Sequence, residues 1–262
     1  LLRWTRLATV DHAQLLDETR QLLVTLATLP ELHTQDPATC QALLGKLLKD
    51  HPFSVTLGVM GSSGHILCSV SSADHTVSPE HTGLQQVLEL REFVMGEYVV
   101  DPANGRATVV ASYPLVDVAG HAQAAVFTEL DMTQWFYELA SGTELPKATV
   151  LMAIDRRGRI FARYPDSERW VGRSLSEIPL IKTLLARGAG VEQLRDVDGT
   201  EKLFAFTLLE YPAAPKAYIS VGIAPAVIFA RPNQMFRQGL LWLGLASGLA
   251  LTGAWVGSDV LV

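Results

Sequence analysis

The strongest constraint in this sequence is an internal repeat. A strand–turn–strand pattern at 55–70 recurs at 149–164, and the turn glycines Gly64 and Gly158 lie 94 positions apart. A second pair of turn glycines keeps the same spacing: Gly105 and Gly199. Each copy reads as a hairpin, a helix and three further strands. A repeat this long indicates a duplicated domain, because solenoid repeats span roughly 20 to 50 residues. The sequence therefore predicts an α+β fold with two antiparallel sheet modules.

A second constraint is the apolar stretch near the C-terminus. Residues 238–258 contain no charged side chain, although 18% of the whole chain is charged. As a helix, a segment of this length spans roughly 30 Å, the thickness of one hydrocarbon core. We therefore expect a transmembrane helix over 236–258 and interpret the rest as the part that it anchors.

Helices are predicted before the first module. Apolar residues recur at helical spacing over 9–29, and Pro30 ends the pattern. Asp36 and Pro37 are typical of the start of a second helix, which continues to about Pro52. Residues 1–7 read as the last turn of a further membrane helix. The expected organisation is a helical stalk over 1–52, a distal module over 53–145, a proximal module over 146–230 and the membrane helix.

Composition and motifs exclude several function classes. The net charge is −6, and no basic tract is present, so nucleic acid is not an expected partner. The sequence contains no nucleophile elbow, no glycine-rich phosphate loop and no HExxH motif. We therefore expect no enzyme activity and no cofactor within these residues; a kinase or cyclase activity would lie beyond Val262.

Three segments carry a resemblance to a known family. They are 91–120, 150–177 and 203–224, of which the second is the most specific because Asp155-Arg-Arg-Gly158, Tyr164-Pro165 and Trp170-Val-Gly172 occur together. With the two modules, the leading helix and the membrane helix, they resemble the double Cache (tandem PAS-like) sensory domains of bacterial receptors. That family includes histidine kinases of two-component systems, diguanylate cyclases and chemoreceptors.

The resemblance implies a sensor in signal transduction. It places residues 8–235 on the periplasmic side of the inner membrane, as a homodimer. Taken alone, Arg231 and Arg237 before the membrane segment and Asp259 after it favour the opposite orientation by the positive-inside rule. The distal module would bind a small molecule of the amino-acid or organic-acid class. The membrane helix would relay the change to a cytoplasmic output domain outside this chain.

Five residues are candidates for contact with that ligand. Arg91 has a fork that matches a carboxylate, and Tyr98 and Tyr113 offer rings and hydroxyls. Glu129 falls on the strand where amino-acid-binding members of the family carry an acidic group. Asp131 either contacts the ligand or, as we favour, caps the helix that follows.

One departure from the family supports a different function. Amino-acid-binding members carry an arginine and two aromatic residues where this chain reads Ser78-Pro-Glu-His-Thr-Gly-Leu84. The alternative function is a ligand-free spacer that dimerises through the long helix. Histidines of the same region, His75 and His81, are interpreted as exposed loop residues rather than metal ligands.

The two cysteines allow two interpretations. In an oxidising compartment, Cys40 in the second helix and Cys68 in the second strand would form a disulfide between helix and sheet. Otherwise they are buried free thiols that pack as small apolar residues. The architecture favours the disulfide. In the proximal module, the loop 164–172 is expected to be a structured loop held in place by Trp170.

Overall fold

The structure is a computed structural model. It describes residues 1–33, 36–72, 82–101, 104–117, 119–142, 145–146 and 148–226, together with 242 and 247. The predicted membrane segment 236–258 lies outside this part, apart from Trp242 and Ser247. Within the described residues, no helix is both long enough and apolar enough to cross a bilayer.

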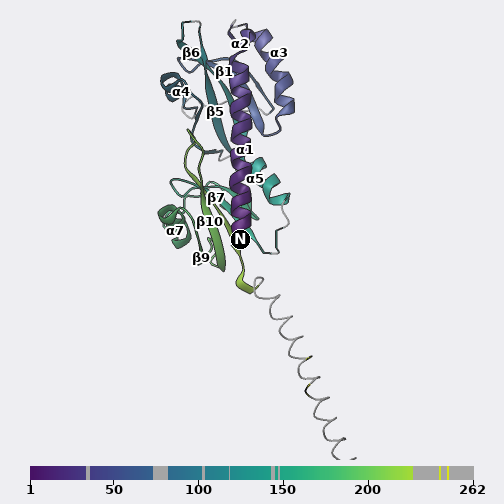
Figure 1. The fold of residues 1–262 in the computed structure, drawn as a ribbon, viewed down its shortest axis with the longest axis vertical. Helices are drawn as coiled ribbons and strands as arrows, with labels where there is room; N and C mark the ends of the chain where they lie inside the picture. The colour runs from purple at the N-terminus through teal and green to yellow at the C-terminus, as the bar shows by residue number, and fades with distance from the viewer. Residues whose placement is uncertain are drawn as a thin grey trace, which may run out of the picture.

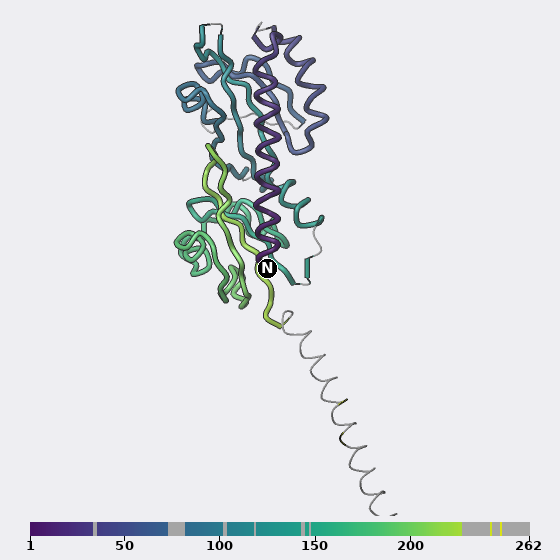
Figure 2. Tube along the Cα trace, in the orientation of Figure 1, coloured from purple at the N-terminus to yellow at the C-terminus, as the bar shows by residue number. Residues whose placement is uncertain are grey.

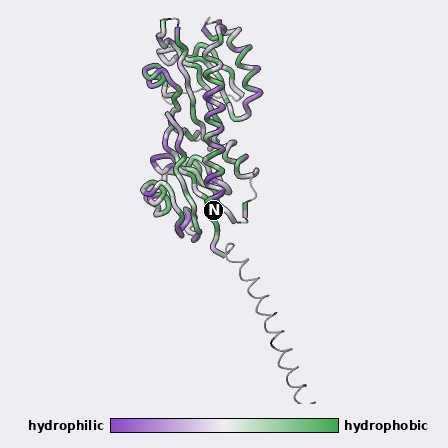
Figure 3. The backbone as a smooth tube through the Cα atoms, in the orientation of Figure 1, coloured by the Kyte–Doolittle hydropathy of each residue, from purple (hydrophilic) through white to green (hydrophobic). Residues whose placement is uncertain are grey.

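One long helix, α1 (Leu2–Ala27), runs along both modules (Figure 1). It contacts β5 and β6 of the first sheet and β10 and β11 of the second. The helix begins earlier than the apolar spacing predicted, because residues 2–8 continue it and bury Thr5 and Ala8. Figure 3 shows hydrophobic and hydrophilic residues mixed along α1, as expected for a helix with one buried side.

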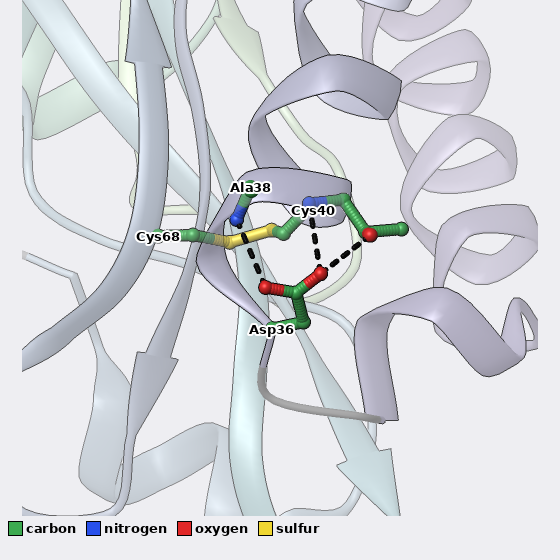
Figure 4. The surroundings of a disulfide bond; sticks show 5 residues. Asp36, Ala38, Cys40 and Cys68 are labelled. Carbon is green, nitrogen blue, oxygen red and sulfur yellow. Dashed lines mark hydrogen bonds between the residues drawn. A yellow bond between two sulfur atoms is a disulfide. The ribbon is translucent and has the colours of Figure 1, made fainter.

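Two short helices follow, and the second is attached to the first sheet by a disulfide. They are α2 (Pro30–His33) and α3 (Pro37–Leu47), and the 3-10 turn η1 (Leu48–Asp50) comes after them. Asp36 caps α3 by accepting hydrogen bonds from the amides of Ala38 and Thr39, both at 3.3 Å. Cys40 of α3 and Cys68 are joined in a disulfide with a Cα–Cα distance of 6.4 Å (Figure 4). The pairing that the architecture favoured is therefore present.

The distal sheet has the strand order β2-β1-β6-β5-β3, with β4 also paired to β5. All its pairings are antiparallel. Its elements are β1 (Ser54–Gly61), β2 (Ile66–Ser71), α4 (Leu84–Leu90), β3 (Val94–Met95), β4 (Val99–Val100), β5 (Ala107–Val116), β6 (Ala122–Asp131) and α5 (Met132–Ser141).

The proximal sheet has the order β8-β7-β11-β10-β9, also antiparallel throughout. Its elements are β7 (Val150–Asp155), β8 (Ile160–Tyr164), α6 (Ser167–Trp170), α7 (Pro179–Arg187), β9 (Gly190–Arg195), β10 (Glu201–Leu209) and β11 (Ala217–Ile223). In both sheets the last strand in sequence lies between the first strand and the strand that precedes it in sequence: β6 lies between β1 and β5, and β11 lies between β7 and β10. This shared order is what duplication of one unit would produce.

Each sheet lies between α1 on one side and a short helix on the other, α4 in the distal module and α7 in the proximal one (Figure 2). One apolar cluster continues from the α1 side of the distal sheet to that of the proximal sheet and includes Leu16, Val126 and Val221. Separate clusters lie beneath α4 and α7. The N-terminus and the end of β11 lie at the same end of the molecule (Figure 1).

The predicted strand over 93–100 is wrong in one respect, because it is divided into β3 and β4. The amide of Gly96 donates to the carbonyl of Val110 at 2.8 Å, within the distal sheet. The amide of Met95 donates instead to the carbonyl of Ala213 in the proximal module, at 3.0 Å. The strand is interrupted because the backbone amides of Met95 and Gly96 donate to different modules.

Candidate functional site

The distal sheet has two faces that differ in what covers them. Successive residues of a strand point to opposite faces, so the clusters identify each face. One carries Met60, Val110 and Phe127 and is covered by Leu84 and Val87 of α4. We call it the α4 face. The other carries alternate residues, such as Val109 and Val126, and packs in the cluster that contains α1.

Glu129 is the acidic residue on the α4 face. It lies two residues from Phe127 on β6 and pairs with Thr56 of β1 and Val110 of β5. Its side chain is buried, with a residue exposure of 2%. The Thr56 hydroxyl donates to Glu129 Oε2 at 3.3 Å and lies 3.1 Å from the Ser71 hydroxyl. A buried carboxylate with hydroxyl neighbours can accept hydrogen bonds from a cationic ligand group.

Asp131 has a structural role at the end of β6. Its Oδ1 accepts a hydrogen bond from the amide of Gln134 at 2.9 Å, which caps α5. Its Oδ2 lies 3.2 Å from Nε of Arg106. The cap favoured from the sequence is therefore present, and the ion pair with Arg106 engages the other oxygen.

The other three candidates do not gather around Glu129. Tyr113 alternates with Ser112 and packs against the cluster on the α1 side. Tyr98 is buried between the modules, where its ring stacks on Phe161 of β8 with centroids 4.3 Å apart. Burial raises the pKa of the Tyr98 hydroxyl. Arg91 is exposed and ends α4 with a φ of 54°.

Residues 73–81 connect β2 to the segment before α4 in the sequence and lie outside the described residues. The predicted loop histidines, His75 and His81, are among them. The polar residues that sequence reasoning missed on this face are Thr56, Ser71 and Ser112. Ser112 donates to the Thr82 carbonyl at 3.1 Å. The sequence feature that could have identified these three residues is a hydroxyl side chain at alternate positions within otherwise apolar strands.

The corresponding face of the proximal sheet is filled by its own side chains. Arg163 is bidentate to Asp196, with N–O distances of 3.1 and 2.8 Å, and Lys202 Nζ lies 2.7 Å from the same carboxylate. The side chains of Arg163 and Asp196 are 2% and 0% exposed. Trp170 covers Arg163, whose guanidinium carbon lies 5.4 Å from the indole centroid.

Apolar residues complete this filling, including Leu180 and Ile181 of α7 and Phe204 of β10. Trp170 anchors its loop, as predicted. An arginine at the end of an otherwise apolar strand was the only sequence signal for this network, and its partner Asp196 lies 33 positions away. The paired charges of Arg163, Asp196 and Lys202 distinguish this face from the α4 face of the distal sheet, which carries Glu129.

A pocket of about 870 Å³ opens between the two modules on the side of α4. Its lining includes Gln86 of α4, Glu97 and Pro215. Arg91, Tyr98 and Tyr113 do not line it. Among the described residues, no group of three or more His, Cys, Asp or Glu side chains is arranged to hold a metal ion.

No protein-family model and no curated protein sequence matches the chain. Solved structures do match. The ligand-binding domain of the Pseudomonas aeruginosa PAO1 amino acid chemoreceptor PctB, in complex with L-Arg, has a TM-score of 0.65 at 15% identity, with 87% of this chain and 95% of that chain covered. The periplasmic sensory domain of the Campylobacter jejuni chemoreceptor Tlp1 has a TM-score of 0.63 at 12% identity, with coverages of 87% and 93%.

An extracellular ligand-binding receptor from Desulfohalobium retbaense DSM5692 has a TM-score of 0.68 at 11% identity; 84% of this chain is covered but only 39% of that chain. The extracellular domain of the histidine kinase rpHK1S-Z16 has a TM-score of 0.63 at 14% identity, with coverages of 83% and 90%. At such low identity these similarities establish the fold. The chain therefore has the fold of the extracellular sensory domains of chemoreceptors and histidine kinases, in agreement with the predicted double Cache architecture.

Proposed function

We propose that this chain is the extracytoplasmic sensory part of a membrane signalling receptor and that its distal module binds a small molecule on the α4 face. The observation that carries the proposal is the contrast between the two sheets. The proximal sheet buries Asp196 together with Arg163 and Lys202 on the equivalent face, whereas the distal sheet buries the carboxylate of Glu129 there, beside the hydroxyl of Thr56. A few convergent polar groups on an apolar surface are typical of a ligand site.

The charge of the distal module supports a ligand with an ammonium group. Residues 53–145 contain 11 Asp and Glu and only 2 Lys and Arg, which are Arg91 and Arg106. Arg91 is exposed, and Arg106 is paired with Asp131. A ligand amine would meet Glu129, and the negative field of the module would attract it. Among the structures with this fold, PctB is in complex with L-Arg and Mlp24 with asparagine.

The location and relay belong to the same proposal. Residues 8–235 would lie outside the inner membrane, where an oxidising compartment favours the Cys40–Cys68 disulfide. Residues 236–258 would cross the membrane and connect the proximal module to a cytoplasmic output domain. Exposed apolar residues near the start of α1, among them Leu7 and Val10, support dimerisation along this helix.

A thermal-shift screen of the purified protein tests the ligand site. The panel would contain the twenty amino acids, 4-aminobutyrate, putrescine, succinate and acetate. We expect an amine-bearing compound to raise the melting temperature, since a ligand at 100 times its Kd stabilises by about 2.7 kcal/mol. Glu129→Gln should abolish the shift, and Glu138→Gln, an exposed acidic residue of α5, should preserve it.

The alternative is a ligand-free spacer. Two observations favour it: the burial of Tyr98 in the module interface and the absence of the family's arginine and aromatic pair at 78–84. The same screen separates the two functions. A panel without any stabilising compound, with a dimer in analytical ultracentrifugation, would support the spacer and count against the sensor.

A further inference from the structure

We propose that residues 93–98, which we call the bridging segment, couple the position of α4 to the proximal module and to strand β11. The segment follows α4 directly, and α4 is the helix that covers the candidate ligand face. This coupling would hold in the absence of ligand, so the inference goes beyond the proposed function and is tested separately from it.

On its distal side the segment is fastened to α4. Leu84 and Val87 of α4 share one buried cluster with Val94 of β3. The contact is close at the start of the helix, since a Cβ on Gly83 would lie 2.9 Å from a methyl carbon of Val94. At the other end of α4, a short turn through Arg91, in the left-handed region with a φ of 54°, leads into the segment. A displacement of α4 therefore also displaces residues 93–98.

On its proximal side the segment makes four separate contacts. Two are with the loop between β10 and β11: the Phe93 ring meets the Tyr211 ring edge-on at 6.1 Å, and the Met95 amide donates to the Ala213 carbonyl at 3.0 Å. Two are with the hairpin of β7 and β8: Arg156 donates to Glu97 Oε1 at 2.8 Å, and Phe161 stacks on Tyr98 at 4.3 Å.

The apolar members of these contacts are buried. Phe93, Met95 and Tyr98 are 4%, 5% and 4% exposed, respectively. Closely packed interior groups cannot slide past one another without a cost in packing. The contacts therefore transmit a displacement rather than absorb it.

The loop at 211–216 connects the segment to helix α1 and to strand β11. The Tyr211 hydroxyl donates to Asp17 Oδ1 of α1 at 2.8 Å. Strand β11 begins at Ala217, immediately after the loop, and lies between β7 and β10 in the sheet. It ends at Ile223, and the strand contacts α1. A displacement of α4 thus has a packed route to β11 that passes through the edge strand β3 and not through the central strands β1, β6 and β5 of the distal sheet.

The rival route is α1 alone, because α1 contacts both sheets. Hydrogen exchange can distinguish the two routes. Val87→Ala loosens α4, whereas Leu44→Ala makes a slightly larger cavity beneath α3, on the other side of the distal sheet; both residues are 0% exposed. If the bridging segment couples the modules, Val87→Ala should accelerate exchange of the amides at 213–219 by roughly fivefold, and Leu44→Ala should leave them unchanged.

A second background shows whether the segment itself is responsible. In a Phe93→Ala protein, the further change Val87→Ala should accelerate exchange at 213–219 less than it does in the unmodified protein, because one of the four contacts on the same path is already lost. Val87→Thr and Leu44→Val serve as milder replacements if the alanine variants do not fold. Equal acceleration by the Val87 and Leu44 variants, or undiminished acceleration by Val87→Ala in the Phe93→Ala background, would overturn the proposal. Neither result would affect the ligand screen.

Discussion

The aromatic ring of Tyr98, from the distal module, lies parallel to that of Phe161, from the proximal module, with an interplanar angle of 2°. The Tyr98 hydroxyl finds no hydrogen-bond partner in the part of the chain that the structure describes. A buried hydroxyl without a partner costs about 1 to 3 kcal/mol, whereas the stacked ring itself is stabilising.

Tyr98→Phe should therefore stabilise the protein by about 1 kcal/mol, because it removes the hydroxyl and keeps the stack. The measurement is the midpoint of urea unfolding. Tyr211→Phe is the matched control with the opposite sign, since it removes the hydrogen bond to Asp17. A loss of stability in Tyr98→Phe would indicate that its hydroxyl has a partner in the folded protein.

The disulfide between Cys40 and Cys68 should make a large contribution to stability. The residues lie 28 positions apart, and the bond joins α3 to the sheet. In the chain-entropy model, a loop of this size corresponds to about 3 to 4 kcal/mol. Replacing both cysteines by alanine should lower the free energy of unfolding by that amount, and a reducing agent should then have no further effect. Unchanged stability on reduction of the unmodified protein would contradict the prediction.

His12 should make the fold sensitive to mild acid. It is buried on α1 against Trp135, with ring centroids 5.4 Å apart, and desolvation lowers its pKa to about 4. Between pH 6.5 and 4 the unfolded chain binds a proton at this residue and the folded chain does not, so stability falls as the pH falls. A shift from 6.5 to about 4 corresponds to about 3 kcal/mol.

Chemical denaturation of the unmodified protein and of His12→Leu, at pH 7 and pH 4.5, measures this effect. The loss on acidification should be smaller in the variant, because the leucine binds no proton in either state. Parallel pH dependence in the two proteins would show that other groups cause the acid sensitivity.

The buried network in the proximal module should be essential for folding. Asp196 pairs with both Arg163 and Lys202, and its side chain is 0% exposed. Asp196→Asn leaves buried Arg163 without a carboxylate and leaves Lys202 with Asp198, 3.4 Å away, which should cost about 3 to 5 kcal/mol. Glu177→Gln breaks an exposed pair with Lys182 and should change the free energy of unfolding by less than about 1 kcal/mol. The two variants are compared by calorimetry, and equal melting temperatures would argue against a stabilising role for the network.

Local patterns predicted most of the elements. The apolar spacing and Pro179 predicted α7 over 179–187, and the run of apolar residues predicted β11 over 217–223, as observed. Asp36 was identified as a helix cap because the side chain and the amides that it binds are neighbours in sequence. Residues 2–8 were missed as part of α1 because Thr5 is a polar residue on its buried side.

The candidate site was less predictable. Glu129 and Tyr113 both lie on strands of the distal sheet, but they point to opposite faces, and which face meets α4 depends on how the helices pack. The pairing of Arg163 with Asp196 and the contact of Met95 with Ala213 join residues that are far apart in the chain.

By itself, the sequence determined the repeat, the alternation of its strands, the turns at its glycines and the cap of α3. Each of these depends on interactions between residues that are close in the chain. Only the tertiary structure decided which charged side chains pair inside the proximal module and which segment connects the two modules. Those outcomes depend on the packing and desolvation of side chains brought together from distant positions, which no local pattern encodes.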